Sequence, residues 1–173
     1  MATTYEFITS ASPSGVHSFA ITNIPQDYDD LLIKFSFRSD YSGGGHEGQF
    51  IFNSVTSGYT QRLLYGTGSG VATASPGTSS NATWTLTING GGTTSSTFSN
   101  GEIYIPNYSS TTVAKSWSSD GVTENNATAA LQYFVAGTNT STAAISSLTF
   151  YAWQSFINFV SGSQIYLYGI KNS

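Results

Sequence analysis

The sequence predicts an all-β protein, an antiparallel β-sandwich of jelly-roll or related Greek-key type, formed as a single domain over residues 1–173. Apolar and polar residues alternate with a period of two along most of the chain, as they do in strands with one buried face. Gly, Asn, Ser and Pro interrupt these runs at short intervals, where turns are expected. A helical period is hard to find. About eight to ten short strands separated by turns are typical of this architecture.

The first half of the chain contains four predicted strands, at residues 16–21, 31–38, 49–52 and 61–65. The second of them is the clearest, because apolar side chains occupy every second position from Leu31 to Phe37. Glycine-rich breaks follow at 43–45 and 66–70, where the conformational freedom of glycine suits tight turns.

The second half contains four more predicted strands, at residues 84–88, 131–135, 145–153 and 165–168. Residues 128–134 fit one or two helical turns as well, but the polar segment that follows them favours a strand. The C-terminal segment Ile165–Ile170 is apolar on both faces. Such a strand is expected at the centre of a sheet or beneath a neighbouring subunit.

Two stretches of the chain resemble each other. Ile24-Pro25 precedes Tyr28 and the strand from Leu31, and about 80 residues later Ile105-Pro106 precedes Tyr108 and a strand expected from Thr111. Proline cannot donate to a β-ladder and therefore lies at strand ends. This repetition predicts two similar corners in the two halves of the domain.

The composition excludes several classes of function. Only 14 of 173 residues are charged, 5 Lys+Arg and 9 Asp+Glu, while Ser and Thr account for 28 and 23. The cations are scattered, which argues against nucleic-acid binding and against a polybasic membrane patch. No apolar run reaches the roughly 20 residues of a membrane-spanning helix, and no secretory signal is visible. The absence of cysteine excludes disulfides and thiolate metal sites.

The densest group of carboxylates is Asp27, Asp29 and Asp30, around Tyr28. Clustered carboxylates serve hydrolytic enzymes and calcium sites. This segment lacks the spacing of a calcium loop and its bidentate Glu. We therefore expect a turn in which the Asp side chains accept hydrogen bonds from local N–H groups, with a structural cation as the alternative.

A second candidate is the segment from Asp40 to Glu47, which combines three glycines with His46. It offers possible metal ligands and an open backbone, but no phosphate-binding motif. We interpret it as a flexible hairpin connection with solvated charges. A Ser-His-Asp arrangement would have to use His46 or His17, and neither lies near a nucleophile elbow. The sequence thus predicts no enzyme, no cofactor, no metal-ligating residue and no catalytic residue.

Aromatic side chains give a third candidate. Tyr151, Trp153 and Phe156, or Trp84 and Trp117, could form a platform on which a sugar stacks. The strands of a sandwich also need large aromatic residues for their core. Core packing is the preferred interpretation for each of them.

Several landmarks follow one another in a familiar order. They are Ile24-Pro25-Gln26-Asp27-Tyr28-Asp29-Asp30-Leu31-Leu32-Ile33 with Arg38-Ser39, then Phe52-Asn53, Tyr59, Ile105-Pro106-Asn107-Tyr108, Ala144-Ile145-Ser146 and the ending Phe159 to Ile170. Over most of the chain this order resembles small virion proteins of tailed phages, especially those of cyanobacteria and marine bacteria. The ending Gly162-Ser163-Gln164-Ile165-Tyr166-Leu167-Tyr168-Gly169-Ile170 is the most specific part.

The resemblance implies a structural β-sandwich protein of the virion. Because the chain starts with Met, enters a strand at once and ends with one, we expect a complete small protein. This favours a decoration (cement) protein on the capsid surface that bridges major capsid subunits as a homotrimer. The alternative is a tail-fibre or receptor-binding module that recognises a host surface glycan. A free carbohydrate-binding or hydrolytic β-protein ranks third.

Overall fold

The structure, a computed structural model, describes residues 5–124, 126 and 130–171. Within these ranges there is no helix that could cross a membrane. Twelve strands are present: β1 (Glu6–Ala11), β2 (Ser18–Ile21), β3 (Asp30–Ser36), β4 (His46–Phe52), β5 (Tyr59–Gly66), β6 (Val71–Ser79), β7 (Ala82–Ile88), β8 (Asn100–Ile105), β9 (Lys115–Glu124), β10 (Ala130–Asn139), β11 (Leu148–Ala152) and β12 (Gln164–Ile170). All eight predicted ranges overlap a strand. The expected number was too low, because β1, β6, β8 and β9 were not among them.

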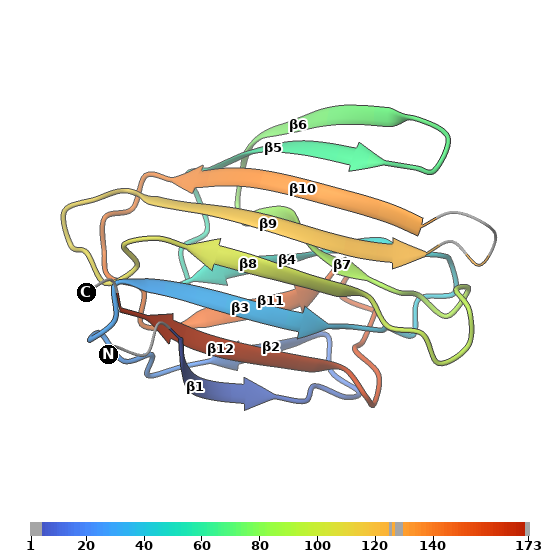
Figure 1. Cartoon of the computed structure of the whole chain (residues 1–173), viewed down its shortest axis with the longest axis horizontal. Helices are drawn as coiled ribbons and strands as arrows, with labels where there is room; N and C mark the ends of the chain where they lie inside the picture. The colour runs from blue at the N-terminus through green and yellow to red at the C-terminus, as the bar shows by residue number, and fades with distance from the viewer. Residues whose placement is uncertain (1–4, 125, 127–129, 172–173) are drawn as a thin grey trace.

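The strands form two sheets. The larger one has the order β1-β12-β3-β8-β9-β10-β5-β6, and the smaller one has the order β2-β11-β4-β7. Every pairing between neighbouring strands is antiparallel. In Figure 1 the larger sheet lies in front and the smaller sheet behind it. The predicted antiparallel β-sandwich is confirmed.

The connections between the sheets are those of a jelly roll. When the hairpins β5-β6 and β9-β10 are set aside, the order β1-β12-β3-β8 faces β2-β11-β4-β7. Successive strands then alternate between the two sheets, except that β4 and β7 pair within one sheet. The two hairpins join each other through β10 and β5 and extend the larger sheet beyond β8. This extension gives the larger sheet twice as many strands as the smaller one.

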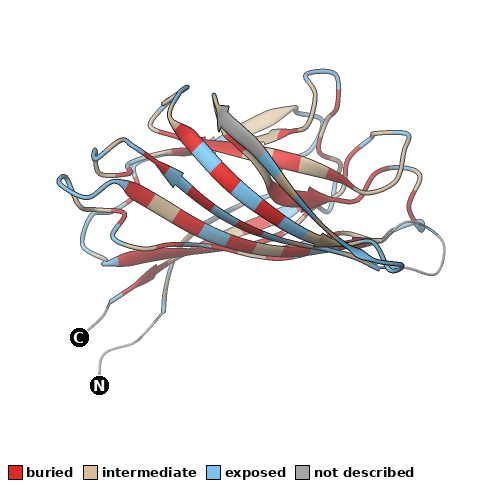
Figure 2. Ribbon diagram, turned by 90° about the horizontal axis from the view of Figure 1, so that it is seen from above, coloured by how far each residue is buried: buried red, intermediate tan, exposed pale blue. Residues whose placement is uncertain are grey.

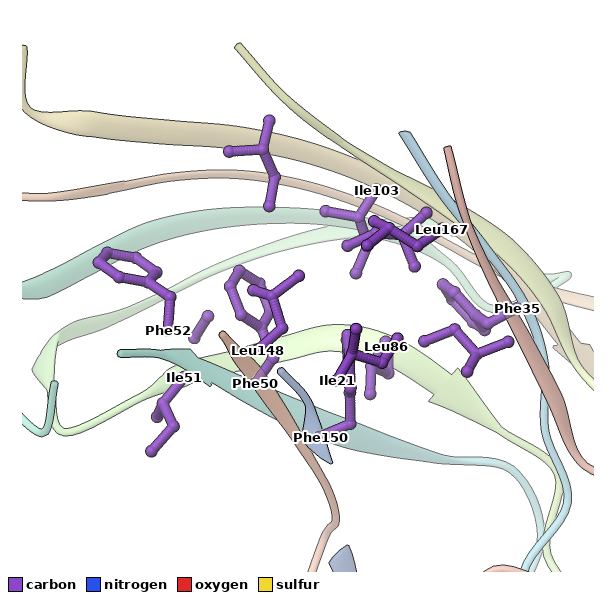
Figure 3. Close-up of a cluster of buried hydrophobic side chains, with 14 of the residues drawn as sticks. Ile21, Phe35, Phe50, Ile51, Phe52, Leu86, Ile103, Leu148, Phe150 and Leu167 are labelled. Atoms are coloured by element: carbon purple, nitrogen blue, oxygen red, sulfur yellow. The ribbon is translucent and has the colours of Figure 1, made fainter. Parts of the chain in front are cut away.

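The core lies between the sheets and is built from the alternating apolar residues (Figure 3). Leu31 and Ile33 of β3 point inward with Leu167 of β12, opposite Phe50 and Phe150 of the smaller sheet, and all five are fully buried. The alternation between buried and exposed residues is visible along single strands in Figure 2. Burial of this apolar surface is the main force that holds the two sheets together.

The two Ile-Pro corners pack against each other. The hydroxyl of the fully buried Tyr108 donates a hydrogen bond to the carbonyl of Pro25. Ser109 Oγ donates to the carbonyl of Tyr28 over 3.0 Å. The similar segments therefore meet at one end of the sandwich, where each closes the other.

Candidate interaction surface

Asp30, the last of the three aspartates of the first corner, is buried and hydrogen-bonded. Asp30 is 4% exposed, and its two carboxylate oxygens accept hydrogen bonds from the Tyr104 hydroxyl at 2.7 Å and the Asn107 N–H at 2.9 Å. The hydrogen bond to Asp30, together with burial, raises the pKa of Tyr104 to about 12. The bonds of Asp30 thus reach the second corner, whereas bonds to local N–H groups were expected. In the described part of the chain, no three His, Cys, Asp or Glu side chains are grouped so as to hold a metal ion.

The segment from Asp40 to Glu47 is not a hairpin, because β3 and β4 belong to different sheets. Both carboxylate oxygens of Asp40 accept hydrogen bonds from Asn158, at 2.7 and 2.9 Å. The glycines of this segment pack against those of residues 90–92, and a side chain at Gly90 would overlap the carbonyl oxygens of two of them. The glycines thus allow two backbone segments to approach closely. The interpretation as a hairpin was wrong, while Asp40 is exposed, as expected of a solvated charge.

His46 forms a buried pair with Ser39. Its Nε2 lies 2.7 Å from Ser39 Oγ, and its Nδ1 lies 2.9 Å from the backbone carbonyl of Glu47. A carbonyl can only accept, so Nδ1 carries the proton and Nε2 accepts from the serine. Burial lowers the pKa of His46. The pair combines a hydroxyl with a base, but Ser39 and His46 are 2% and 4% exposed, and a backbone carbonyl takes the place of a carboxylate.

Core packing was preferred over an aromatic platform for each of the five aromatic residues, and this was wrong for Phe156, which is 71% exposed. Trp117 is 3% exposed and packs in the core against Phe50 and Tyr59. Tyr151 contacts His17, and Trp153 contacts Tyr41, with ring centroids 5.8 Å apart in both pairs. Among the described residues, no ring contact joins Phe156 to Tyr151 or Trp153. In the described part of the chain, none joins Trp84 to Trp117 either. The preference for core packing is confirmed for Trp117.

The exposed apolar side chains lie instead on the outer face of the larger sheet. Six of the ten large apolar side chains that are exposed among the described residues belong to its strands: Phe7, Leu64, Val71, Tyr104, Val122 and Phe134. Tyr5, 54% exposed, directly precedes β1. This distribution identifies the outer face of the larger sheet as the candidate interaction surface.

Four side chains on this outer face form what we call the aromatic row: Phe7, Tyr168, Leu32 and Tyr104. The strand registers place Phe7 opposite Tyr168, Tyr168 opposite Leu32, and Leu32 opposite Tyr104. The row therefore crosses β1, β12, β3 and β8, the four lower strands in the foreground of Figure 1. Phe7 and Tyr168 meet edge to face, with ring centroids 5.9 Å apart. The row thus joins the exposed Phe7 and Tyr104 through the half-buried Tyr168 and through Leu32, which is only 8% exposed.

A shallow depression of about 410 Å³ accompanies the row. Its lining consists of Tyr5, Leu32, Lys34, Glu102, Tyr104, Tyr168 and Ile170. The two charged members neutralise each other in an ion pair of 3.4 Å, Lys34 to Glu102. The surface can therefore contact an apolar or aromatic partner without burying an unpaired charge.

The sequence signal for this surface was the C-terminal segment. The structure places β12 between β1 and β3, with Ile165 and Leu167 buried against the core. On the other face, Tyr166 and Tyr168 are half-buried. β12 is thus an inner strand next to the edge strand β1, and the described residues cover its outer face only in part.

The comparisons with known proteins add no name to this geometry. No model of a known protein family matches the sequence, and no curated protein matches it.

Proposed function

We propose that the protein is a structural component of a tailed-phage virion that decorates the outer surface of the assembled head. The observation that supports this role is the aromatic row, with the apolar depression beside it. Contiguous exposed apolar patches mark interaction sites in soluble proteins. The occupant in this proposal is the surface of the major capsid protein, contacted at the junction between its subunits.

The scarcity of charge supports the same role. Contacts made by apolar and hydroxyl groups depend little on ionic strength, which suits a particle that meets variable salt. A protein that binds the assembled shell and not its separate subunits stabilises the shell by mass action. As a homotrimer it would present three aromatic rows at once, which raises the strength of attachment without new contacts.

The fold agrees with this proposal but does not decide it. Jelly rolls occur in viral capsid proteins and in lectins. Many unrelated functions share such a fold, so the argument depends on the surface.

A binding assay with two variants tests the proposal. Phe7→Ser and Phe156→Ser each remove one exposed phenyl ring, 57% and 71% exposed, but only Phe7 belongs to the aromatic row. Each protein is mixed with heads that lack the decoration protein, and the bound fraction is measured by co-sedimentation. We expect Phe7→Ser to weaken binding about tenfold and Phe156→Ser to leave it unchanged. Equal binding by both variants would contradict the assignment of the docking surface.

The second candidate function is recognition of a host glycan by a tail-associated module. The three tyrosines Tyr5, Tyr104 and Tyr168 around the 410 Å³ depression favour it, since aromatic faces and hydroxyls suit neutral sugars. Saturation-transfer NMR with neutral oligosaccharides tests it. Saturable binding that is lost in Tyr168→Ser, combined with no binding to heads, would favour this function over decoration.

A further inference from the structure

We propose a second binding site on the larger sheet: a trough over β9, β10, β5 and β6 that binds a carboxylate-bearing glycan, with Arg62 as the residue that holds the carboxylate. The site lies outside the aromatic row, and the inference does not depend on where in a virion the chain is placed.

The trough consists of two adjoining depressions of about 780 and 650 Å³. Arg62, Ser75 and Ala136 line both of them, so the depressions meet at Arg62. The strand registers place Arg62 opposite Ala136, and Ala136 opposite Ser118. Ala136 and Ser118 are small and form the floor of the trough. The larger side chains of Arg62, Leu64 and Phe134 surround this floor.

Arg62 differs from the other four cations of the chain. Lys34 is paired with Glu102, and Lys171 lies over the ring of Tyr28. Arg38 donates four hydrogen bonds to residues 93–97, and Lys115 donates four to backbone carbonyls.

Arg62, in contrast, donates a single hydrogen bond among the described residues, to the carbonyl of its neighbour Gln61. Its guanidinium group carries five N–H donors. Arg38 and Lys115 are each held by several oxygen acceptors, whereas Arg62 has neither such a set of acceptors nor an acidic or aromatic partner among the described residues. Among the described residues, it is also the only charged side chain that lines either depression.

The lining around Arg62 fits a sugar acid. A guanidinium group binds a carboxylate through two parallel hydrogen bonds. Leu64 and Phe134 are 43% and 45% exposed and lie directly opposite each other, which provides an apolar wall for the C–H face of a sugar ring. Hydroxyl groups suited to sugar hydroxyls complete the lining: Thr60, Thr73, Ser75, Ser116, Ser118 and Thr138.

The geometry favours a glycan over an acidic peptide. An extended peptide gains most of its affinity by pairing its backbone with an open sheet edge. The trough instead crosses a face where β9, β10, β5 and β6 are already paired with one another. The backbone groups of β9, β10 and β5 are therefore used within the sheet, and although β6 is an edge strand with one free side, recognition over the floor depends on side chains.

The two surfaces of the larger sheet serve different partners without overlap. Neighbouring strands of a twisted sheet are rotated by roughly 20–25° relative to each other. The strands of the trough are thus turned away from the strands of the aromatic row, and Figure 2 shows the curvature of the sheet. A trough on an attached protein can remain open to solvent.

Isothermal titration with the full chain tests the site. The probes are oligomers of galacturonate, alginate and sialic acid, and the methyl ester of the galacturonate oligomer serves as the matched neutral ligand. We expect saturable binding of at least one acidic oligomer, about tenfold weaker for its neutral form. Arg62→Gln should lower the affinity about tenfold as well. Lys171→Gln, which removes an exposed cation outside both the trough and the aromatic row, should have no effect. Equal melting temperatures would show that both variants are folded.

Three results would overturn the inference. The first is no saturable binding to any of the three acidic oligomers. The second is equal affinity for the galacturonate oligomer and its methyl ester, or for the Arg62 and Lys171 variants. The third is binding of poly-glutamate in preference to all three, which would identify the occupant as an acidic peptide. None of these results bears on attachment to heads, so the failure of this site and the failure of the proposed function are distinguishable.

Discussion

Gly137 of β10 has no room for a side chain, because the indole ring of Trp117 lies against it. A Cβ atom at this position would lie 2.7 Å from Trp117 Cη2 and closer still to Cζ2 and Cε2. Carbon atoms in contact are normally about 3.5–4.0 Å apart. The ring cannot easily retreat, since Phe50 and Tyr59 pack against it with centroids 5.4 and 5.9 Å away.

Gly137→Ala should therefore destabilise the protein by about 3 kcal/mol, the upper end of the usual cost of overpacking. In a chain of this length, that corresponds to a melting temperature lower by roughly 6–12 °C. Gly66→Ala is the matched control, because Gly66 lies in the adjacent strand β5 and a Cβ there meets no atom within 4 Å. This control should be neutral or stabilise the protein by up to about 1 kcal/mol.

Chemical denaturation followed by circular dichroism measures both free energies of unfolding. A double-mutant cycle with Trp117→Phe measures the interaction energy between positions 117 and 137, since the smaller ring leaves space beside residue 137. In that background Gly137→Ala should cost much less than in the parent protein. Equal stabilities of the two alanine variants, or an absence of coupling to Trp117, would refute the packing described for this part of the core.

Three further predictions follow from buried and exposed groups. The ammonium group of Lys115 is 1% exposed and lies within hydrogen-bond distance of four backbone carbonyls. Lys115→Met should therefore lower the free energy of unfolding by roughly 1–3 kcal/mol. An unchanged denaturation midpoint would contradict this. Because burial lowers the pKa of His46, only the unfolded chain takes up this proton as the pH falls through about 6.5. Stability should then decline from pH 7 to pH 5, and more steeply than in His46→Gln, as thermal unfolding at each pH would show; parallel pH profiles would disprove it. Burial and the hydrogen bond to Asp30 raise the pKa of Tyr104 to about 12. Its absorbance change should therefore appear later in an alkaline titration than those of exposed tyrosines. Burial also raises the pKa values of Tyr59 and Tyr108 to about 12, so Tyr104→Phe should reduce that late component by one tyrosine and leave the rest.

The sequence pattern located most strands whose inward residues are apolar, although not β8 with its buried Ile103 and Ile105. The alternation also missed β9, whose inward positions include Ser119, Gly121 and Thr123. A Cβ at Gly121 would lie 2.5 Å from Thr87 Oγ1 of β7, so this part of the interior is built from small and polar groups. A period of two in hydropathy cannot reveal such a strand, although its burial alternates at every position.

The candidate site was harder to predict because it depends on which strands become neighbours. Alternation indicates that Leu32 and Tyr168 each share a face with other residues, but not that the two side chains meet. Asp30 and Asn107 lie 77 residues apart in the chain, and only the packing of the two corners joins them. The apolar outer face of the C-terminal strand was the one signal in the sequence that pointed to the interaction surface.

The most direct test of the proposed function is the copy number of the protein in purified virions of its phage. Quantitative mass spectrometry, normalised to the major capsid protein, measures it. Decoration of the head predicts a copy number comparable to that of the major capsid protein. A copy number that is a small fraction of it would contradict decoration of the whole shell and favour a place on the tail. Absence from the particle would contradict the virion assignment itself.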